Sequence, residues 1–553
     1  MNLRRWPLWV AAVLSAGLLE LPFPIAGPMP PWRSIFAWFG LVPLLWAVLS
    51  PPCVRGPRPL RAAFLAAYGC GVLWYAGNCY WIYDTMMHYG SLPPWVSVLL
   101  LLGFSLVLGL YFGLFGLGVA FVQKTTGSTR LALAFAPVLW TALELAAARI
   151  TSVPWDQLGY SQVDNGFISR LAPWTGVYGI SFVLVAANSL LASGFLTPRA
   201  LTGRFTKGFG WSFASACLAL ACFSGIYLPP VKAPTSATAV LIQPNLDVSH
   251  TGYWLGPGEW ASHMAQFIQL AELSCKSYIA GIPQTGAPSV SPSCPPQPAR
   301  PDLVAWPESP APFFESDPRF RQSMSGIAQV VQAPLIVNGI GSQFSAAEGG
   351  WHDYVSAMIF TAAGREIGRY DKMHLVPFGE YIPFARLLFF AHKLTGKVAS
   401  FTPGSTRKVF HIEGPDGRMQ RYGVFICYEA VFADEVRQFA KLGAEVLVNL
   451  SDDGWYGDTS APWQHLNMAR MRAVENRRWL LRDTNNGVTA VIDPYGRVVQ
   501  SIPRHQVDAL PAAFGFRDDI TFYTAHGDVF AWLCVILTIG VIAWSVNRQQ
   551  ASR

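Results

Sequence analysis

Three polar residues each stand at the end of an apolar run in the second half of the 553-residue chain. They are Glu308 after LVAWP, Lys372 after GRYD and Cys427 after GVFI. A buried carboxylate whose pKa is raised can act as a general base, and a cysteine thiol becomes a nucleophile beside a base or a cation. An ammonium group can stabilise the oxyanion that forms when a thiolate adds to a carbonyl. Together these residue types predict acyl transfer through a covalent intermediate on Cys427.

Each of the three also has a plainer explanation when it is taken alone. A cysteine in a strand is often only a small buried apolar residue. Glu308, which follows Trp-Pro, could cap the start of a helix, and Lys372 could be the solvated end of a hairpin. The predicted elements help to decide between these interpretations, because they determine whether the three residues can meet.

Short β-branched runs alternate with amphipathic stretches from residue 236 onward, which predicts an α/β domain. Hairpin-like segments make its sheets mixed, and we expect two sheets packed face to face with helices outside, an αββα sandwich. Ligands in α/β sheets bind beyond the carboxyl ends of strands, where all three candidates stand. The expected strands cover 238–243, 302–308, 333–340, 353–372, 421–429, 444–453 and 479–501. The expected helices cover 257–280, 317–331, 430–442 and 462–478.

The rest of the chain is far more apolar, which indicates a membrane protein. Only 13% of all residues are charged and 52% are hydrophobic, and stretches near the ~20 apolar residues that cross a bilayer recur. We expect eight spans, at 8–26, 34–49, 62–83, 95–121, 131–149, 176–196, 211–229 and 527–546. The first could be a signal peptide, but no convincing cleavage site precedes the second, so we interpret it as a retained helix.

These spans divide the chain into three parts. Residues 1–235 are expected to form a membrane domain of seven helices, 236–515 the α/β domain, and 516–553 a last membrane helix with its tail. The fold class predicted is thus a multi-span α-helical membrane domain joined to an α/β domain.

Basic residues in the short loops set the orientation, because Lys and Arg are retained on the cytoplasmic side. If the N-terminus is cytoplasmic, the outer loops carry little beyond Arg33, Arg149 and Arg170. Both termini are then cytoplasmic and the α/β domain lies outside. The net charge of +7 follows from this asymmetry, so we expect no nucleic-acid partner. No glycine-rich phosphate loop or Cys/His metal spacing appears, and we expect neither a metal nor a cofactor.

The cysteines outside the expected spans are Cys275, Cys294 and Cys427. Cys275 and Cys294 flank a segment rich in Pro, Gly and Ser and could close a disulfide in an oxidising compartment. Thiol labelling of the native protein that found both free would exclude this bond. Cys427 would then be left unpaired, as a nucleophile must be.

The contexts of the three candidates resemble a known family. WPES (306–309), YDKMHLVPFGEYIP (370–383) and FICYEAVF (425–432) are similar to the Glu-Lys-Cys contexts of the nitrilase, or carbon-nitrogen hydrolase, superfamily, and the similarity continues to residue 497. VPWDQLGYSQVDNGFISRLAPWTGVYGISF (153–182) resembles the segment between the fifth and sixth spans of one branch, the bacterial inner-membrane apolipoprotein N-acyltransferases. The resemblance covers nearly the whole chain, apart from a long insertion around 281–300.

This resemblance implies a ping-pong reaction on the periplasmic side of the inner membrane. Cys427 would take an acyl chain from a phospholipid, typically phosphatidylethanolamine, as a thioester. The α-amine of an apolipoprotein's diacylglyceryl-cysteine would then accept the chain as an amide, which gives a triacylated lipoprotein. In this scheme Glu308 is the base and Lys372 the oxyanion partner.

The resemblance also implies supporting roles for four further residues. Glu380 in FGEYIP matches a carboxylate that supports Lys372, and Tyr428 and Glu429 match supporting positions beside the thiol. Trp254 matches an aromatic residue near the acyl entrance.

Two segments suit the handling of lipid. YIPFARLLFFAHKLTGK (381–397) places Phe389 and Phe390 between basic residues, which predicts an arm in the membrane interface, although a buried helix turn is the plainer alternative. DDGWYGDTSAPWQH (452–465) could be a mobile lid in which Trp455 contacts substrate and keeps water from the thioester. His465 at its end is interpreted as a surface or packing residue.

Two other function classes stay open at this point. A membrane-tethered amidase of the nitrilase type would use the same three residues but let water resolve the thioester. An inactive membrane scaffold would not need Glu308, Lys372 and Cys427, and the spans lack the interior charge pairs of a proton-coupled pump.

Overall fold

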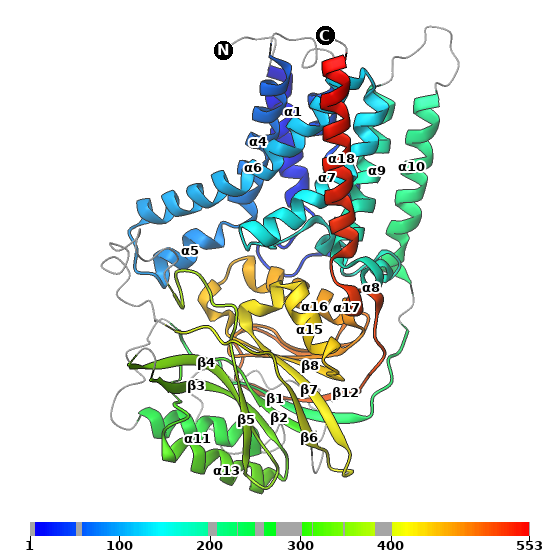
Figure 1. Ribbon diagram of the computed structural model, residues 1–553. Helices are drawn as coiled ribbons and strands as arrows, with labels where there is room; N and C mark the ends of the chain where they lie inside the picture. The colour runs from blue at the N-terminus through cyan, green and yellow to red at the C-terminus, as the bar shows by residue number, and fades with distance from the viewer. Residues whose placement is uncertain are drawn as a thin grey trace.

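The structure is a computed structural model that describes residues 6–50, 58–196, 207–228, 231–248, 259–272, 301–311, 313–346, 349–381 and 401–551. It has a bundle of helices at one end and two β-sheets with their covering helices at the other (Figure 1). The start of α1 and the end of α18 lie at the same end of the bundle, away from the sheets.

Helical structure forms at each of the eight stretches predicted to span a membrane. These elements are α1 (Trp6–Glu20), η2 (Pro31–Trp38) with α2 (Val42–Leu49), α4 (Pro59–Asn78), α6 (Pro94–Thr126), α7 (Thr129–Ile150), α9 (Val177–Leu196), α10 (Lys207–Phe223) and α18 (Val529–Ala551). Within the described residues, five helices are long and apolar enough to cross a membrane: Pro31–Leu49, Pro94–Thr126, Thr129–Ile150, Val177–Leu196 and Val529–Gln550. α1 is shorter than predicted, since Pro22 and Pro24 follow its last turn and cannot extend a helix.

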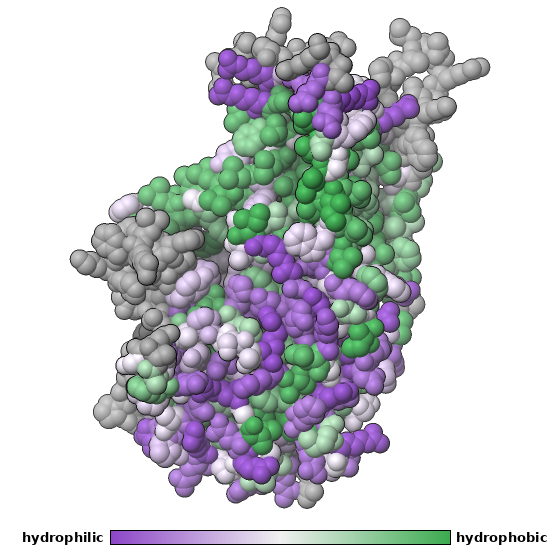
Figure 2. Space-filling view, in the orientation of Figure 1, coloured by the Kyte–Doolittle hydropathy of each residue, from purple (hydrophilic) through white to green (hydrophobic). Residues whose placement is uncertain are grey.

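The outer surface of these helices is apolar. Figure 2 shows hydrophobic residues over the bundle and a mostly hydrophilic surface over the sheets. The exposed large side chains of the bundle include Trp95, Phe195, Phe213, Ile536 and Ile539. In water such a surface would be unfavourable, but hydrocarbon is its natural solvent. The helical part is therefore a membrane domain.

α4 and α6 pack closely because glycine faces the partner helix. A Cβ atom on Gly116 would lie 2.4 Å from the Cβ of Ala67 and 2.8 Å from the carbonyl oxygen of Ala63. A Cβ on Gly109 would lie 2.7 Å from Cγ2 of Val72. Small residues allow membrane helices to approach in this way, where packing is the main attraction between them.

We expect Gly116→Leu to force α4 and α6 apart and to lower the free energy of unfolding by about 1–3 kcal/mol. Gly103→Leu is the matched control, because Gly103 lies on the same helix with nothing within 4 Å of its Cβ position. Thermal unfolding in detergent measures both variants. An equal Tm for the two would contradict the proposed importance of this contact.

The α/β part holds two mixed sheets of six strands each, in the orders β12-β1-β2-β3-β4-β5 and β11-β10-β9-β8-β7-β6. Strands β1 to β3 are parallel to one another, as are β7 to β9, and the remaining pairs are antiparallel. The first sheet consists of β1 (Ala237–Gln243), β2 (Leu303–Trp306), β3 (Leu335–Ser345), β4 (Gly350–Phe360), β5 (Glu366–Asp371) and β12 (Asp508–Phe514). The second consists of β6 (Val409–Glu413), β7 (Met419–Ile426), β8 (Val446–Ser451), β9 (Trp479–Thr484), β10 (Thr489–Ile492) and β11 (Val498–Ile502).

The two sheets pack face to face around one apolar core, to which strands of both contribute. α11 (Glu259–Glu272) and α13 (Pro318–Val331) cover the first sheet, and a second core lies beneath them. α15 (Ala433–Lys441) and α16 (Ala461–Asn476) cover the second sheet on the side of the membrane helices (Figure 1). The predicted αββα sandwich joined to a helical membrane domain is confirmed.

The membrane domain and the sheets share a continuous boundary. Apolar residues of α16 and of the segment after Cys427 belong to the same buried cluster as the membrane helices. Polar contacts cross the boundary too: Arg472 Nη2 donates to the hydroxyl of Tyr160 (2.9 Å), and the backbone N–H of Val177 donates to Glu475 (3.1 Å). Arg472 and Glu475 are a fully buried ion pair on α16. This boundary fixes the second sheet against the membrane domain.

Candidate active site

The strands bring the three candidate residues to one edge of the sandwich. Glu308 follows β2 by two residues, Lys372 directly follows β5, and Cys427 directly follows β7. β2 and β5 belong to one sheet and β7 to the other, so the site lies between the sheets at their carboxyl ends.

The Lys372 ammonium is held between two carboxylates. Its Nζ lies 3.1 Å from Oε1 of Glu308 and 2.6 Å from Oε1 of Glu380, and its side chain is fully buried. The second oxygen of each carboxylate accepts a backbone N–H, from Asp452 for Glu308 (3.1 Å) and from Val376 for Glu380 (2.8 Å). These bonds fix both carboxylates, so the position of the ammonium is well defined.

Burial and charge act in opposite directions on these groups. Burial alone would lower the pKa of Lys372, but Glu308, Glu380 and Cys427 together hold that pKa well above its ordinary value. Burial raises the pKa of Glu380, which Lys372 partly offsets. Lys372 is therefore charged at neutral pH, as an oxyanion partner must be.

The Cys427 thiol lies close enough to Glu308 and Lys372 for both charges to affect its pKa. Burial raises its pKa well above the ordinary value, Glu308 raises it further, and Lys372 lowers it. The buried carboxylate of Asp453 raises it as well. The resting thiol is therefore protonated, and it needs a base at the moment of attack.

Cys427 stands at a sharp strand-to-helix turn. Its φ of +47° lies in the left-handed region, which costs a residue with a side chain about 1–3 kcal/mol. The short helix η7 (Cys427–Val431) begins there. Strain of this kind persists only where the neighbouring structure compensates for it.

Glu429 provides part of that compensation. Its Oε2 accepts the N–H of Ile426 (2.7 Å), and its Oε1 accepts from the hydroxyl of Tyr370 (2.7 Å) and the N–H groups of Met373 (2.8 Å) and His374 (3.2 Å). One buried carboxylate thus ties the turn at Cys427 to the segment after Lys372.

We expect Glu429→Gln to lower the free energy of unfolding by about 1–3 kcal/mol. Both carboxylate oxygens of Glu429 accept from donors, so the N–H₂ group of the introduced amide must face a buried N–H without an acceptor. Glu413→Gln on β6 is the matched control, since that side chain is exposed. Denaturant unfolding compares the two variants. Equal stability would show that the amide can be accommodated and that the four bonds contribute little.

Tyr428 connects the site to the membrane domain. Its ring stacks with Trp155 at 6.5 Å between centroids, and its hydroxyl donates to the carbonyl oxygen of Ser152 (3.5 Å). Trp155 also contacts Trp81, Tyr456 and His465, and its Nε1 donates to Gln464 (2.8 Å). Tyr428, the residue directly after Cys427, is thus in contact with the loop that follows α7.

A cavity of about 40 Å³ lies between this loop and the membrane helices. Its walls come from α1, α4, α6, α7 and residues 153–158, and they are largely aromatic: Trp74, Tyr75, Tyr111, Phe112, Trp140 and Trp155. Glu144, Asp156 and Gln157 add polar groups. Trp155 therefore lines an aromatic cavity and also contacts Tyr428, the residue beside Cys427.

Other predicted substrate residues are only partly described. Trp455 is 38% exposed, and its ring packs against Tyr89 at 5.9 Å, while Tyr456 beside it is buried. The movement of this segment as a lid stays a prediction. Trp254, Phe389, Phe390 and the pair Cys275 and Cys294 lie outside the described residues.

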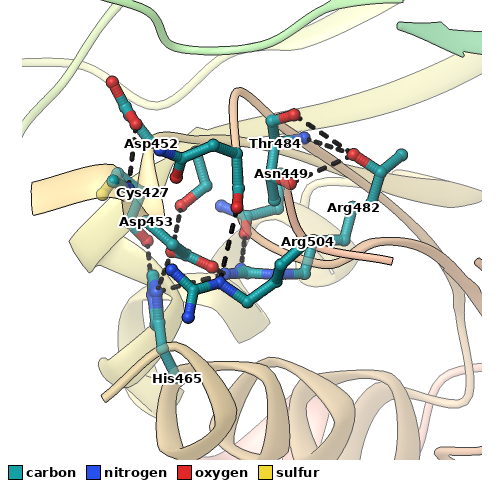
Figure 3. A network of polar contacts seen from close by, with 12 residues as sticks. Cys427, Asn449, Asp452, Asp453, His465, Arg482, Thr484 and Arg504 are labelled. Carbon is teal, nitrogen blue, oxygen red and sulfur yellow. Dashed lines mark hydrogen bonds and ion pairs between the residues drawn. The ribbon is translucent and has the colours of Figure 1, made fainter. Parts of the chain in front are cut away.

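The structure adds a charged network that the sequence did not indicate (Figure 3). His465 is fully buried on α16, where Nε2 faces the carbonyl oxygen of Cys427 (3.1 Å) and Nδ1 faces Asp453 (3.0 Å). Arg482 on β9 donates to both oxygens of Asp453 (2.9 and 2.7 Å). Of the two interpretations of His465, the surface position is wrong and the packing position is confirmed, since its buried ring packs against Trp155 and Tyr456. Polar contacts hold it as well. Nearly all of α16 is buried, so its sequence lacks the periodicity that would have marked His465 as internal.

Two family models match the chain. Residues 15–190 match the apolipoprotein N-acyltransferase N-terminal domain, and residues 255–510 match carbon-nitrogen hydrolase. An apolipoprotein N-acyltransferase of Geobacter metallireducens is 33% identical over 98% of this chain and 96% of its own length. The chain belongs to the apolipoprotein N-acyltransferase family. A member from Chlorobaculum tepidum is 28% identical over 96% of this chain and 95% of its own length.

Membership of the apolipoprotein N-acyltransferase family agrees with both halves of the fold. The first model covers most of the membrane domain, and the second covers most of the sandwich.

Among solved structures, Nit3 of Saccharomyces cerevisiae, a member of branch 10 of the nitrilase superfamily, matches 52% of this chain and 93% of its own, with 17% identity and a TM-score of 0.35. Among the residues that the structure describes, no group of three or more His, Cys, Asp or Glu could hold a metal ion.

Proposed function

We propose that the chain N-acylates the N-terminal diacylglyceryl-cysteine of apolipoproteins, with a membrane phospholipid as acyl donor. Glu308, Lys372 and Cys427 carry the chemistry. Glu380, Tyr428 and Glu429 hold them in place, and Trp254, Phe389, Phe390 and Trp455 contact substrate. No cofactor is required.

In the first half-reaction Cys427 attacks an ester of the phospholipid, for which phosphatidylethanolamine is the proposed donor. Glu308 takes the thiol proton as the sulfur–carbon bond forms, and Lys372 stabilises the oxyanion. The ester C–O bond then breaks, and Glu308 returns the proton to the leaving alkoxide. The products are a thioester on Cys427 and a lysophospholipid.

In the second half-reaction the free α-amine of the lipoprotein attacks the thioester carbonyl. Glu308 accepts the amine proton as the C–N bond forms, and Lys372 again stabilises the oxyanion. The C–S bond breaks, and the proton passes from Glu308 to the sulfur. The product is an amide, and the thiol is restored for the next cycle.

The observation that best supports this proposal is the position of Cys427 at the boundary with the membrane domain. Tyr428 packs on Trp155, and Trp155 lines the aromatic cavity between the membrane helices. An amidase acting on small soluble amides has no need of such a boundary. A lipid donor, by contrast, must bring an ester from the bilayer to the thiol.

The orientation proposed is that of a multi-pass protein of the bacterial inner membrane with its sandwich in the periplasm. It is supported by the excess of Lys and Arg in the predicted cytoplasmic loops. The start of α1 and the end of α18 at the same end of the bundle agree with an even number of crossings.

The test is a transfer assay with purified protein, vesicles containing a phospholipid with a fluorescent acyl chain, and a diacylated lipopeptide. The expected product is a lipopeptide that carries the fluorescent chain in a hydroxylamine-resistant amide. Ammonia release from small amides without lipopeptide acylation would favour an amidase. Inactivity in both assays would favour a scaffold.

A further inference from the structure

Side chains hold the backbone on either side of Cys427. On one side Glu429 accepts the N–H of Ile426, and on the other the Nε2 atom of His465 meets the carbonyl oxygen of Cys427 (3.1 Å). Cys427 itself is in the left-handed region at φ +47°. The carbonyl contact is the one that fixes the peptide between Cys427 and Tyr428.

The contact with the carbonyl determines which nitrogen of His465 carries a proton. A carbonyl oxygen can only accept, so Nε2 must carry the proton and donate. Burial, followed by the Arg482 guanidinium, lowers the pKa of His465, while the carboxylate of Asp453 and the Cys427 carbonyl act in the opposite direction. Nδ1 lies 3.0 Å from a carboxylate oxygen of Asp453 and 3.1 Å from Nη2 of Arg482, so both ring nitrogens have polar partners.

Buried groups hold the imidazole ring itself in place (Figure 3). Asp453 lies beside Nδ1 and also accepts from the hydroxyl of Ser451 (3.0 Å) and from Arg482. Arg482 also donates to the side chain of Asn449 on β8. His465, Asp453, Arg482 and Asn449 are all fully buried, so the ring has little freedom to turn.

The peptide bond transmits the position of the carbonyl to the next N–H. A trans peptide is planar, so the N–H of Tyr428 points opposite to the carbonyl of Cys427. Within the part of the chain that the structure describes, this N–H meets no hydrogen-bond acceptor. It is therefore available to an oxyanion formed beside the thiol.

We infer that His465 is a positioning residue, which holds the Cys427 carbonyl so that the Tyr428 N–H stays directed at the oxyanion as a second donor beside Lys372. This inference rests on the proposed function. Without the Nε2–H donor, the peptide between Cys427 and Tyr428 can rotate away from the strained turn. The loss then falls on the chemical step, whereas lipid binding is unchanged.

The test compares three substitutions of His465. Gln places an amide N–H₂ near the position of Nε2 and can still donate to the carbonyl. Asn is too short to reach the carbonyl, and Leu has no donor. His411→Gln on the exposed face of β6 is the control for the purified protein. Intact-protein mass spectrometry follows formation of the acyl adduct in single turnovers with phospholipid vesicles, at several lipid concentrations.

We expect His465→Leu and His465→Asn to slow acylation about 100- to 1,000-fold, the loss typical of one oxyanion donor, at unchanged half-saturating lipid concentration. His465→Gln should stay within about tenfold of the wild type, since it keeps the donor. If the His465→Leu variant does not fold, the comparison of His465→Gln with His465→Asn still tests the inference, because both introduced side chains are polar. The inference would be overturned if His465→Asn acylated at the wild-type rate, or if His465→Gln and His465→Asn lost the same factor in acylation rate.

The wild type separates this inference from the proposed function. An adduct on Cys427 that forms equally fast in all folded variants would overturn the inference alone. A wild type that never acquires the adduct would overturn the proposed function and the inference with it.

Discussion

Cys427→Ala should abolish both the acyl adduct and the transfer of acyl chains to lipopeptide. We expect a fall of at least about 10⁴-fold in the transfer rate, as in other enzymes that lose their covalent nucleophile. The remaining site could still bind lipid, but water or amine would have to attack the ester directly. Intact-protein mass spectrometry should find a fatty-acyl mass on the wild type that hydroxylamine removes and that the variant lacks.

Two further variants make this result specific to Cys427. Cys534→Ala removes a buried thiol of α18 and should leave adduct and transfer unchanged. Cys427→Ser keeps a nucleophilic atom at the same place, but a hydroxyl ionises far less readily than a thiol. Burial already raises the pKa of the Cys427 thiol well above its ordinary value, so a hydroxyl there should be inert. Transfer by Cys427→Ala at the wild-type rate would exclude the thioester mechanism.

The sequence predicted the fold and the meeting of the three residues for the same physical reason. Glu308, Lys372 and Cys427 each end an apolar run, and such runs become buried strands. In a sandwich of mixed sheets, the ends of β2, β5 and β7 come to one edge. The strand ends therefore indicated that the three residues could meet, and the resemblance to the nitrilase superfamily assigned them to one site.

Other parts of the fold carry weaker local signals. β12 pairs with β1 along its whole length, but it contains Pro511. Proline is typical of edge strands and interrupts the run of strand-forming residues by which a strand is recognised in a sequence. The predicted span 62–83 is divided in the structure between α4, which ends at Asn78, and α5 (Trp81–His88). The apolar run continues across this break, so composition alone cannot locate it.

Contacts between distant segments could not be predicted from local patterns. Trp155 and Tyr428 are separated by 273 positions, and they meet because the second sheet packs on the membrane domain. The same holds for Asp453, His465 and Arg482, which come from three elements and form one network only in the folded chain. Local sequence identifies the residues that could react. The packing of the sheets against the helices determines which other residues hold them in position.

The buried charges explain why Lys372 is expected to have two separable roles. As a cation it balances Glu308 and Glu380, and as a donor it stabilises the oxyanion proposed for each half-reaction. A buried carboxylate without its partner is costly, and loss of one member of a buried ion pair typically destabilises by about 3–5 kcal/mol. A single substitution of Lys372 therefore affects stability and catalysis together.

Lys372→Met should reduce acyl transfer at least about 100- to 1,000-fold, the loss expected for one oxyanion donor, and should also lower the free energy of unfolding by about 3–5 kcal/mol. Lys441→Met on α15 is the matched control, since that side chain is exposed and its loss should change neither quantity. The transfer assay measures the first effect, and thermal unfolding in detergent measures the second.

Adding Glu380→Gln to Lys372→Met separates the two roles. The amide removes one of the two carboxylates that lost their cation, so the double variant should regain part of the lost stability. Its transfer rate should stay as low as that of Lys372→Met, because no donor for the oxyanion has been restored at that position. If the double variant regained activity together with stability, Lys372 would act only by balancing charge, and oxyanion stabilisation would rest on backbone N–H groups alone.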